Sequence, residues 1–554
     1  MVCTGGVTQV KHHASCSRTP VERIAQGTIP QDTCELTSHF RLLSVSGHYA
    51  CREDAFRGRV YHTPLFRHNL CLDRKWFVHK PCACNHMNAA FGRVGKCIPQ
   101  HDPDFVYKHL APFVRSLAQS IGRHPAVQYV DVYRNMSRKK YLRYEKAHKN
   151  LTRQGGQVYT DQSRINMFVK LEGISFDKNN PDCRAIQFRT PEYTLALAAA
   201  LKRAEHMLYE LTDVVGFGLG RLFAKNMNNV QRAEALLAKN HPGWHKIELD
   251  ASRWDAHYNP TFNKLEALLT QLTCLSPDIV DLMKRQWLNR GSFRTRTQSG
   301  TFKAKYEVKG GRMSGDANTA FGNCAIMGCL LAAFGTWSKR NFTFLCDGDD
   351  SVFFHDGDVI TDEEISAFFL QFGVVMAVEN RPEAFEDIGF CQAKPVLVDG
   401  RWTMVRSVSK IMSKLGVSPK LAAGRAKYLR TVALGELSLL RGCPVLQAFL
   451  QAIIRNCEQN IKNKTQKHRI HKSALEDYFR LKSFIPKDWQ VVKHRPVSDL
   501  SRASFQRAYG INIEQQLVLE RALEGWAFDL GKTRDGEGID VPNWLFPWLK
   551  PEEW

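Results

Sequence analysis

The stretch FTFLCDGDDSVFF, residues 342–354, sets the local fold around the most acidic turn of this chain. Apolar residues recur at every second position on both sides of that turn, namely Phe342, Phe344 and Cys346 before it and Val352 and Phe354 after it. This period of two, with Gly348 at the tip, is typical of a β-hairpin. The sequence therefore predicts that the three aspartates stand on the turn between two strands.

Two other segments contain polar residues at the start or at the end of an apolar pattern. ELDASRWD, residues 248–255, ends a short apolar alternation at Asp250 and so predicts the end of a neighbouring strand. SGDANTAFGN, residues 314–323, leads into an apolar stretch from Thr319 to Trp337. That stretch is near the membrane-spanning length of about 17 to 20 residues. It contains Asn323 and several small residues, so we expect a buried core helix instead.

Each of these residues also has an ordinary interpretation. Asp255 and Ser314 could cap the helices that follow them, which is a common use of Asp and Ser. Asp347 could be a turn residue. Taken singly, the acidic positions do not decide between a structural and a functional role. The order of the three segments along the chain, DxxxxD, then SGxxxTxxxN, then GDD, favours one shared site.

Convergent carboxylates of this kind suit divalent cations. Mg²⁺ takes oxygen ligands and keeps several waters, so a few carboxylates are enough to hold it. Two such cations, about 4 Å apart, stabilise the attacking and leaving oxygens of an in-line displacement at phosphorus. We expect Asp250 and Asp349 to be the metal ligands, with Asp350 beside them.

The segments DASRWDAH, GGRMSGDANTAFGNC, DGDD and FCQAKPV with WTMVR resemble the RNA-dependent RNA polymerases of tombusviruses and their carmovirus-like relatives. The resemblance runs from about residue 105 to about residue 510. It implies an α+β right-hand fold of fingers, palm and thumb, in which the palm is an antiparallel sheet of the RNA-recognition type with helices and the thumb is mostly helical. It also implies a replicase of a positive-strand RNA virus that copies RNA from RNA with Mg²⁺ or Mn²⁺.

The resemblance assigns roles to single positions. It makes Asp250, Asp349 and Asp350 the catalytic and metal-binding carboxylates. Asp255, Thr319 and Asn323 would sense the ribose 2′-hydroxyl of the incoming nucleotide, and a site built for that hydroxyl rejects the deoxy analogue. The remaining positions would support the nucleotide and the template (Ser314 and Gly315) or place the nascent 3′ end (Cys391 and Gln392).

Upstream, FVKLEGISFDKNNPDCRAIQFRTPEY, residues 168–193, resembles the fingers motif that handles the triphosphate. Its cations, Lys170, Lys178, Arg184 and Arg189, suit a polyphosphate, and arginine adds a bidentate fork. A solvated basic loop is the ordinary alternative. The position ahead of the three acidic segments favours nucleotide binding for Lys170 and Arg184 most of all.

One position departs from the family pattern. Within GVVMAVEN, residues 373–380, relatives typically carry a lysine where this chain has Ala377. That lysine is the usual candidate for the acid that protonates the leaving pyrophosphate, and alanine cannot donate a proton. Arg381 is close in sequence but rarely gives up its proton. Three alternatives stay open: water protonates the pyrophosphate, another group does, or the lysine of the relatives is not the acid.

The composition suits a partner with a phosphate backbone. Lysine plus arginine number 77 against 55 for aspartate plus glutamate, a balance of 77 − 55 = +22. One basic focus, residues 138–146, interleaves Tyr141 and Tyr144, which would suit base stacking. A second basic focus spans residues 462–472. Both could equally be solvated helix faces.

A chain of 554 residues exceeds the usual size of a single core, so several lobes are expected. We expect fingers over 104–244 and 280–312, palm over 245–279 and 313–405, and thumb over 406–554. Residues 421–440 have the three-and-four spacing of a helix, which Gly442 and Pro444 end.

Residues 1–103 are expected to form a separate extension, since the first hundred residues hold eight of the sixteen cysteines and eight histidines. Cys82, Cys84 and His86 are closely spaced, but the paired spacing usual for zinc is missing. A loosely folded segment with reduced thiols is the preferred interpretation over a zinc site.

The expected partners are template and nascent RNA, ribonucleoside triphosphates and a membrane-anchored viral replicase subunit. The chain has no predicted signal peptide or transmembrane segment. We therefore expect it in the host cytoplasm, recruited to membrane-bound replication complexes, either through residues 1–103 or as the downstream part of a longer product.

Two other functions compete with this interpretation. A reverse transcriptase has a similar palm, but typically a bulky residue in place of Asp255. An RNA-binding protein without catalysis would be expected to lose the metal carboxylates, and all of them are present.

Overall fold

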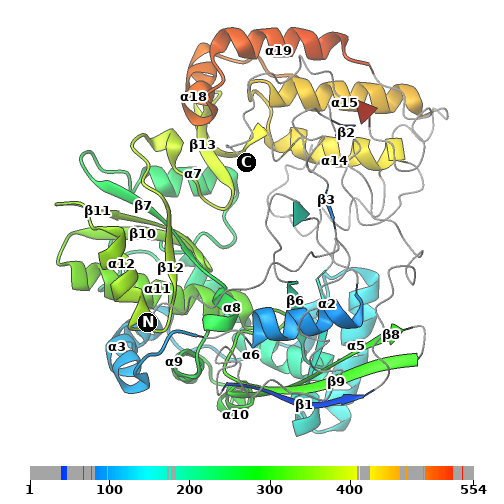
Figure 1. The fold of residues 1–554 in the computed structure, drawn as a ribbon, viewed down its shortest axis with the longest axis vertical. Helices are drawn as coiled ribbons and strands as arrows, with labels where there is room; N and C mark the ends of the chain where they lie inside the picture. The colour runs from blue at the N-terminus through cyan, green and yellow to red at the C-terminus, as the bar shows by residue number, and fades with distance from the viewer. Residues whose placement is uncertain are drawn as a thin grey trace, which may run out of the picture.

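The computed structural model describes residues 39–46, 66–67, 76–77, 81–95, 98–170, 174–175, 183–297, 300–408, 411, 425–461, 470, 491, 493–527 and 539–540. These residues form three regions, which Figure 1 shows from bottom to top. A five-stranded sheet with helices lies at the bottom, a four-stranded sheet with helices lies above it, and a helical layer lies at the top. The fold is thus mixed α and β.

The four-stranded sheet is antiparallel, in the order β10-β11-β7-β12. Its strands are β7 (His245–Ala251), β10 (Phe342–Asp347), β11 (Asp350–His355) and β12 (Met376–Asn380). Strands β10 and β11 form the predicted hairpin, with only Gly348 and Asp349 between them. Gly348 has a φ of +80°, which glycine supplies without strain at the first loop position of a type II′ turn. Strand β7 contains Asp250 near its end, as predicted.

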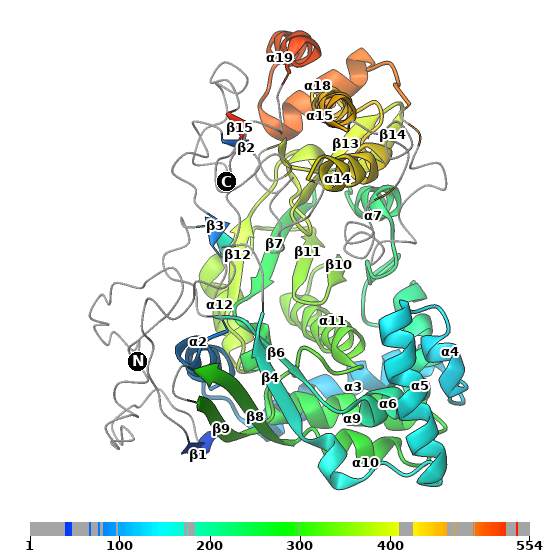
Figure 2. The same cartoon turned by 90° about the vertical axis from the view of Figure 1, so that its right-hand side faces the viewer.

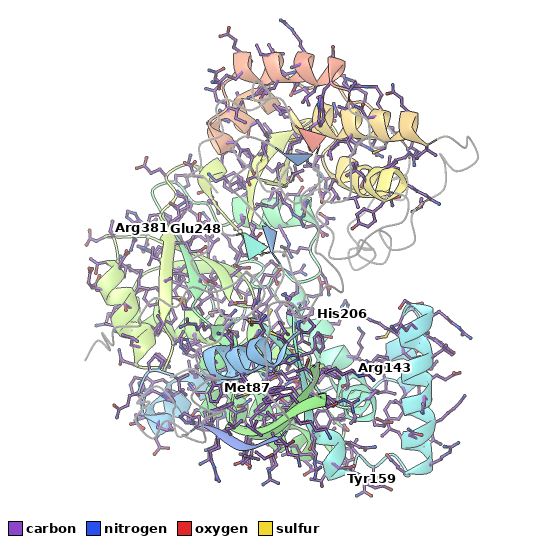
Figure 3. The ribbon with its side chains drawn as sticks, turned by 45° about the vertical axis from the view of Figure 1, so that its right-hand side comes forward. Met87, Arg143, Tyr159, His206, Glu248 and Arg381 are labelled. Carbon is purple, nitrogen blue, oxygen red and sulfur yellow. The ribbon has the colours of Figure 1, made fainter. Side chains whose placement is uncertain are left out.

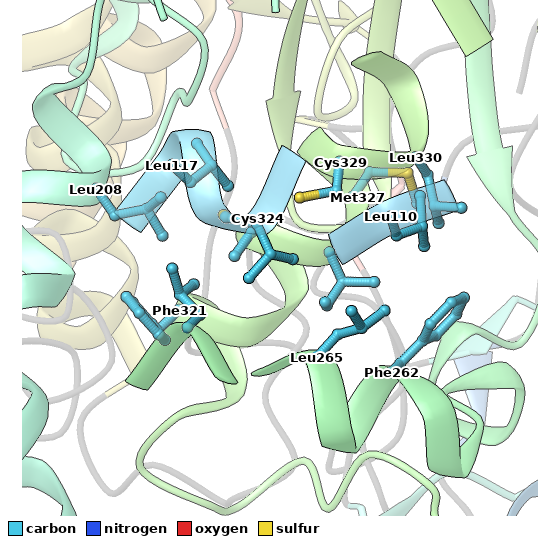
Figure 4. Packing of buried hydrophobic residues seen from close by; sticks show 14 of the residues in the cluster. Leu110, Leu117, Leu208, Phe262, Leu265, Phe321, Cys324, Met327, Cys329 and Leu330 are labelled. Atoms are coloured by element: carbon cyan, nitrogen blue, oxygen red, sulfur yellow. The ribbon is translucent and has the colours of Figure 1, made fainter. Parts of the chain in front are cut away.

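One face of this sheet packs on helices. The helix predicted from Thr319 is α11 (Thr319–Ser338), and it shares a core cluster with Ile247, Leu249 and Phe353 of the sheet. Around α11 lie α3 (Pro103–Ile121), α6 (Pro191–Glu210), α9 (Pro260–Thr273) and α12 (Asp362–Leu370). Figure 4 shows side chains of α3, α6 and α9 packed against Phe321 and Met327 of α11.

Within the described part of the chain, α11 alone is long and apolar enough to span a membrane, and 83% of its apolar window is buried in the protein. The prediction of a core helix is confirmed.

The opposite face of the four-stranded sheet contacts a smaller unit. Leu345, Val352 and Phe354 pack there with α7 (Asn229–Leu237), the 3-10 turn η4 (Phe385–Asp387) and the two-stranded sheet of β13 (Ala393–Val398) and β14 (Arg401–Arg406). The top layer comprises α14 (Arg425–Leu439), α15 (Leu446–Asn460), α18 (Asp499–Tyr509) and α19 (Ile513–Gly525). These helices share a core cluster with β13 and β14. The end of α14 at Leu439 agrees with the break predicted at Gly442 and Pro444.

The five-stranded sheet has the order β1-β9-β8-β4-β6. Its strands are β1 (Phe40–Ser46), β4 (Ile165–Val169), β6 (Ala185–Phe188), β8 (Leu288–Thr297) and β9 (Gly300–Lys309). Helix α2 (Ala83–Asn88) and the π-helix η2 (Ala89–Val94) pack on one face, where Met87 is fully buried. Figure 3 labels Met87 on α2 above this sheet.

Further helices complete the lower region. They are α4 (Tyr129–Tyr133), α5 (Arg138–Arg153), the 3-10 turn η3 (Thr160–Ser163), α8 (Trp254–His257) and α10 (Ile279–Lys284). Figure 2 shows α4, α5 and α6 beyond the β4 and β6 end of the sheet, on the other side from β1. Two short pairings, β2 (Phe66–Arg67) with β15 (Ile539–Asp540) and β3 (Trp76–Phe77) with β5 (Ile174–Ser175), join distant parts of the chain.

The described residues of 1–103 do not stand apart from this architecture. Strand β1 forms the edge of the five-stranded sheet, and Phe40 stacks on Tyr306 of β9. Cys82 caps α2 by accepting a hydrogen bond from the Asn85 amide, and the buried His86 ring bonds the Cys82 carbonyl at 2.8 Å. The side chain of Cys84 lies outside the described part. Cys82 and His86 thus have structural roles here, and the described segments of 1–103 belong to the same core as β4, β8 and β9.

Candidate active site

The aspartates form a row across the four-stranded sheet. Asp347 is paired with Asp350, and Ser351 with Leu249, so the next pair along the same register brings Asp350 opposite Asp250. On its other side, Asp250 is paired with Ala377. Directly opposite residues of antiparallel strands point to the same face. The row Asp347, Asp350, Asp250, Ala377 therefore lies on the face away from α11, with Asp349 at the adjoining turn.

The carboxylates of this row disfavour one another's charge. Burial, together with Asp349 and Asp250, raises the pKa of Asp350 to about 6. Burial also raises the pKa of Asp349, while Arg184 and Lys225 oppose that rise. A divalent cation would relieve such repulsion, and carboxylate oxygens are suitable ligands. Across the described residues, no three His, Cys, Asp or Glu side chains already converge as a closed metal cage.

Asp347 differs from its neighbours because cations surround it. It forms ion pairs with Lys225 and with Arg232 of α7, the latter at 2.6 Å, and its side chain is largely buried. Burial alone would lower the pKa of Lys225, but Asp347, Cys324 and Cys391 together outweigh burial and raise it. The Cys391 thiol lies 3.8 Å from the same carboxylate. Asp347 therefore fastens the hairpin to its surroundings, consistent with the structural interpretation of this residue.

Asp255 lies on α8, beyond the end of β7, and faces the same acidic group. Burial and the charge of Asp349 raise its pKa, while Arg312, Arg184 and Arg93 oppose that rise. The Arg312 amide donates to the Asp255 carbonyl at 2.8 Å. Asp255 is thus within electrostatic reach of Asp349, as expected for a site that would hold both the metal and the nucleotide.

Arg312 connects Asp255 with Asn323. Its Nε donates to Asn323 Oδ1 at 2.9 Å, and its guanidinium pairs with Glu266 at 2.7 Å. Both charged side chains are almost completely buried, at 1% and 0% exposure. Because the Asn323 oxygen is occupied, its amide NH₂ is oriented away from Arg312.

The partner carboxylate, Glu266 on α9, is fully hydrogen-bonded. It accepts from the Tyr258 hydroxyl at 2.6 Å and from Asn318 at 2.7 Å, in addition to Arg312. The Arg312 guanidinium also stacks 3.8 Å from the Tyr258 ring centroid. A Cβ on Gly322 would sit 2.3 Å from both Arg312 and Glu266. The network therefore requires glycine at this turn of α11.

The loop before α11 rests on β6. The Gly315 amide donates to the Gln187 carbonyl at 2.7 Å, and the Ser314 hydroxyl donates to the Ala185 carbonyl at 3.2 Å. The Thr319 hydroxyl lies 2.8 Å from the Asp316 carbonyl. Thr319 thus closes the loop in this conformation, whereas Asp255 and Asn323 are brought together through Arg312.

Arg189 has a different environment from the one expected for a phosphate ligand. Its side chain is 1% exposed, and Nε bonds both oxygens of the equally buried Asp316 at 3.0 Å. Its other nitrogens donate to the Ser163 carbonyl at 2.5 Å and to Asn289. This arrangement favours a role in supporting the Ser314–Asp316 loop over direct contact with a triphosphate.

The other cations of that motif are placed unequally. Arg184 lies near enough to oppose the rise in the pKa of both Asp255 and Asp349. Lys170 adjoins it, since the Lys170 amide donates to the Arg184 carbonyl at 2.7 Å. Lys178 lies outside the described residues.

Cys391 and Gln392 form the turn between η4 and β13. Both have positive φ values, +50° and +64°, in a turn closed by reciprocal bonds between Phe390 and Ala393. Burial raises the pKa of the Cys391 thiol, which argues against a reactive thiolate. The contact with Asp347 places this turn beside the aspartate row.

Several functional neighbours were not predicted from the sequence. Arg312 and Gly322 lie within GGRMSGDANTAFGNC and could have been predicted from that segment. Lys225, Arg232 and Glu266 carried no local signal, and Arg93 lay in the segment taken for an extension. The tyrosines at 141 and 144 were expected to suit base stacking, but both are half-buried against the core beside α4 and α6. The second basic focus, 462–472, lies almost wholly outside the described part.

A sequence model described as viral RNA dependent RNA polymerase matches residues 75–531. The chain is 29% identical to the RNA-directed RNA polymerase of Panicum mosaic virus over 463 residues, 81% of this chain and 44% of that protein. It is 30% identical to that of Oat chlorotic stunt virus over 464 residues (79% and 58%) and 28% identical to that of Tomato bushy stunt virus over 498 residues (84% and 56%). The chain thus spans about half the length of the curated relatives it matches.

Proposed function

The chain belongs to the viral RNA-dependent RNA polymerase family, and on this basis we propose that it adds ribonucleotides to an RNA 3′ end under the direction of an RNA template. The observation that carries the proposal is the row of carboxylates across β11 and β7, with Asp349 at the turn. We extend it to replication of a positive-strand genome, as the relatives from tombus- and carmovirus-like viruses suggest.

We assign the right-hand layout to the observed regions. Palm is proposed for the four-stranded sheet and α11, over 245–279 and 313–405, and fingers for 104–244 and 280–312. Thumb is proposed for 406–554, supported by the separate core cluster of α14, α15, α18 and α19. The described segments of 1–103 would complete the fingers sheet.

Asp250, Asp349 and Asp350 would hold Mg²⁺ or Mn²⁺. The mutual repulsion that raises the pKa of Asp350 fits a site completed by cations. Two bound cations would stabilise the attacking 3′ oxygen and the departing pyrophosphate. Because no closed cage preexists among the described residues, waters and the triphosphate would supply the other ligands.

The chain's own residues would bind and orient the nucleotide. Arg184 and Lys170, with Lys178, would contact the triphosphate, whereas Arg189 would act through the Ser314–Asp316 loop. Asp255 and Asn323 would bind the 2′-hydroxyl, and Thr319 would hold the loop that presents them. Ser314 and Gly315 would support the template base, and the Cys391–Gln392 turn would place the nascent 3′ end.

Relatives typically carry a lysine at the position of Ala377, and no other lysine of the described site takes its place. Arg381 is bonded to Asp362 of α12 at 2.6 Å and to the Ile360 carbonyl at 2.7 Å, so it does not extend toward Asp250. We therefore propose that water or a group other than Arg381 protonates the pyrophosphate.

The partners would be template, nascent RNA and ribonucleoside triphosphates, together with a membrane-anchored viral subunit that recruits the chain to cytoplasmic replication complexes. A reverse transcriptase is the alternative that shares this palm. The position of Asp255 beside Asp349 supports ribonucleotides over deoxyribonucleotides.

The test is incorporation by the purified chain on a short RNA template, with Mg²⁺ or Mn²⁺ added or chelated. Asp349→Ala and Asp250→Ala should abolish incorporation while RNA binding, which rests on distant Lys and Arg, is kept. Asp358→Ala, an exposed carboxylate beyond the far end of β11, is the matched control and should retain activity. Synthesis that survives in either site variant would refute the assignment.

A further inference from the structure

The outer face of β1, β9 and β8 carries an unusual density of cations. Alternation along β8 and β9 places one set of side chains in the core cluster with α2 and the other set in solvent, and β1 adds an edge on which most side chains are exposed. The exposed set includes Arg41, Arg290, Arg294, Arg296, Lys303 and Lys305. We call these six residues the basic sheet face.

The cations stand next to one another across the strands. Arg294 is paired with Lys303, and Lys303 in turn with Ser46 of β1. Glu307 is the carboxylate on the same face, and it bonds Arg290 at 3.0 Å. Together with Glu307, the six residues of the basic sheet face have a balance of 6 − 1 = +5. Within the described residues, the other five cations form no ion pair with a carboxylate. Holding like charges this close costs stability, so a polyanion that covers them would be favoured.

The geometry suits a phosphate backbone. Exposed residues two apart on one strand are separated by about 6.6 Å, and neighbouring strands by about 4.8 Å. These spacings are comparable with the distance between successive phosphates of an extended strand. The hydroxyls of Ser44, Ser46 and Ser292 alternate with the cations and add hydrogen-bond donors.

The same face continues onto an exposed aromatic surface. Asn166 of β4 is paired with Ser292 of β8, so Asn166 and Phe168 point to the outer side. Phe168 is 44% exposed, and its ring lies 5.8 Å from that of Phe188. Arg143 of α5, labelled in Figure 3, is 5.8 Å from the Phe188 ring centroid. Cations beside an accessible ring are the features that bind unpaired bases and their phosphates.

We propose that the basic sheet face and Phe168 bind single-stranded RNA at a site outside the catalytic row. The aromatic ring favours unpaired bases over a duplex, whose bases are already stacked. Leu288 and Phe168 are exposed apolar side chains on this face, but the six cations and three serines outnumber them, which favours RNA over insertion into a membrane. The site would hold template RNA that has not reached the aspartates, and this binding does not depend on catalysis.

Charge reversal at two facing positions tests the proposal. The double variant Arg294→Glu, Lys303→Glu replaces a facing pair of positive charges by a pair of negative charges. The repulsion between the two positions stays similar, so the sheet should fold. Lys108→Glu with Arg115→Glu on the exposed side of α3 changes the net charge by the same amount and is the control. Affinity for a labelled single-stranded RNA would be measured by fluorescence anisotropy at several salt concentrations.

The sheet variant should bind about tenfold more weakly, and its slope of log affinity against log salt should fall by about 1.4, the value for two lost contacts to a single strand. The α3 variant should keep both values. Phe168→Ala should weaken binding while leaving the salt slope unchanged, because stacking releases no counterions.

Incorporation adds a second readout. Loss of the basic sheet face should lower synthesis on long templates and leave synthesis unchanged on templates too short to reach it. Equal loss of affinity in the two charge variants would overturn the proposal. So would unchanged RNA affinity combined with lost binding to phosphatidylserine vesicles, or a preference for duplex over single-stranded RNA. Absence of incorporation in the wild-type chain would refute the proposed polymerase function alone, since the binding measurements stand without it.

Discussion

Replacing Arg312 by lysine should weaken discrimination against deoxyribonucleotides. Arg312 bonds Glu266 and Asn323 through different nitrogens, at 2.7 and 2.9 Å. A lysine ammonium is a single point charge on a flexible stem and cannot reproduce this fork. It should stay with Glu266, because an unpaired buried carboxylate is costly. Asn323 would then lose the donor that fixes its amide orientation.

The magnitude follows from the one bond that is lost. A hydrogen bond from a charged donor contributes about 1.5–3 kcal/mol. If roughly half of this acts on sugar selection, discrimination between ribo- and deoxyribonucleotides falls by about 0.75–1.5 kcal/mol, which is about 4- to 13-fold in the ratio of their use. Lost stacking on Tyr258 adds about 1 kcal/mol of destabilisation, so thermal unfolding must confirm that the variant is folded.

The assay is kcat/KM for ATP and dATP on one template, in a double-mutant cycle with Asn323→Ala. If Arg312 acts through Asn323, then Arg312→Lys should reduce the ratio in the wild-type background and have little further effect in Asn323→Ala. Arg401→Lys is the matched control, since Arg401 also pairs with a glutamate but is 67% exposed. Fully additive effects, or an unchanged ratio in a folded Arg312→Lys variant, would refute the reasoning.

Three other substitutions probe different parts of the chain. Gly315→Ala would place a Cβ 2.5 Å from the Gln187 carbonyl oxygen, so the loop must move and incorporation should fall at least tenfold with RNA binding kept; unaltered kinetics would contradict this. Ala377→Lys should raise the single-turnover rate if proton transfer to pyrophosphate is limiting, since a positioned acid contributes about 10² to 10⁴ fold, whereas an unchanged rate would mean that another donor serves. Burial lowers the pKa of Lys239 to about 7, so the folded chain binds fewer protons than the unfolded chain from about pH 7 to pH 10 and should gain stability as pH rises. Lys239→Met should remove that gain, which melting temperatures across the window would reveal.

The local parts of this structure follow from the sequence because neighbouring residues determine them. The hairpin at 342–354, the strand before Asp250 and the helix from Thr319 are all confirmed at nearly the expected positions. Each depends on a short apolar period and on turn residues. The alignment of Asp350 with Asp250 could not be read in the same way, because register between distant strands depends on tertiary pairing.

The parts that were not predicted depend on partners far along the chain. Lys225 and Asp347 are 122 residues apart, and no local pattern marks such a pair. Arg189 and Arg184 belong to the same basic segment. Arg189 is buried against Asp316, whereas Arg184 lies close enough to Asp349 to oppose the rise in its pKa. Strand β1 was taken as part of an extension, because its pairing with β9 joins residues more than 250 positions apart.

The contrast between α11 and the loop before it concerns stiffness. Helix α11 is held by apolar contacts along most of its length, so Asn323 is mounted on one of the least deformable elements of the protein. The part of the loop at Ser314 and Gly315 is held instead by two hydrogen bonds to β6, which can exchange for water one at a time, whereas Asp316 is anchored by its buried pair with Arg189. Under the proposed function, the loop at Ser314 and Gly315 would yield as RNA advances while the Asn323 amide stays in place, so sugar selection and movement along the template would depend on different parts of the protein.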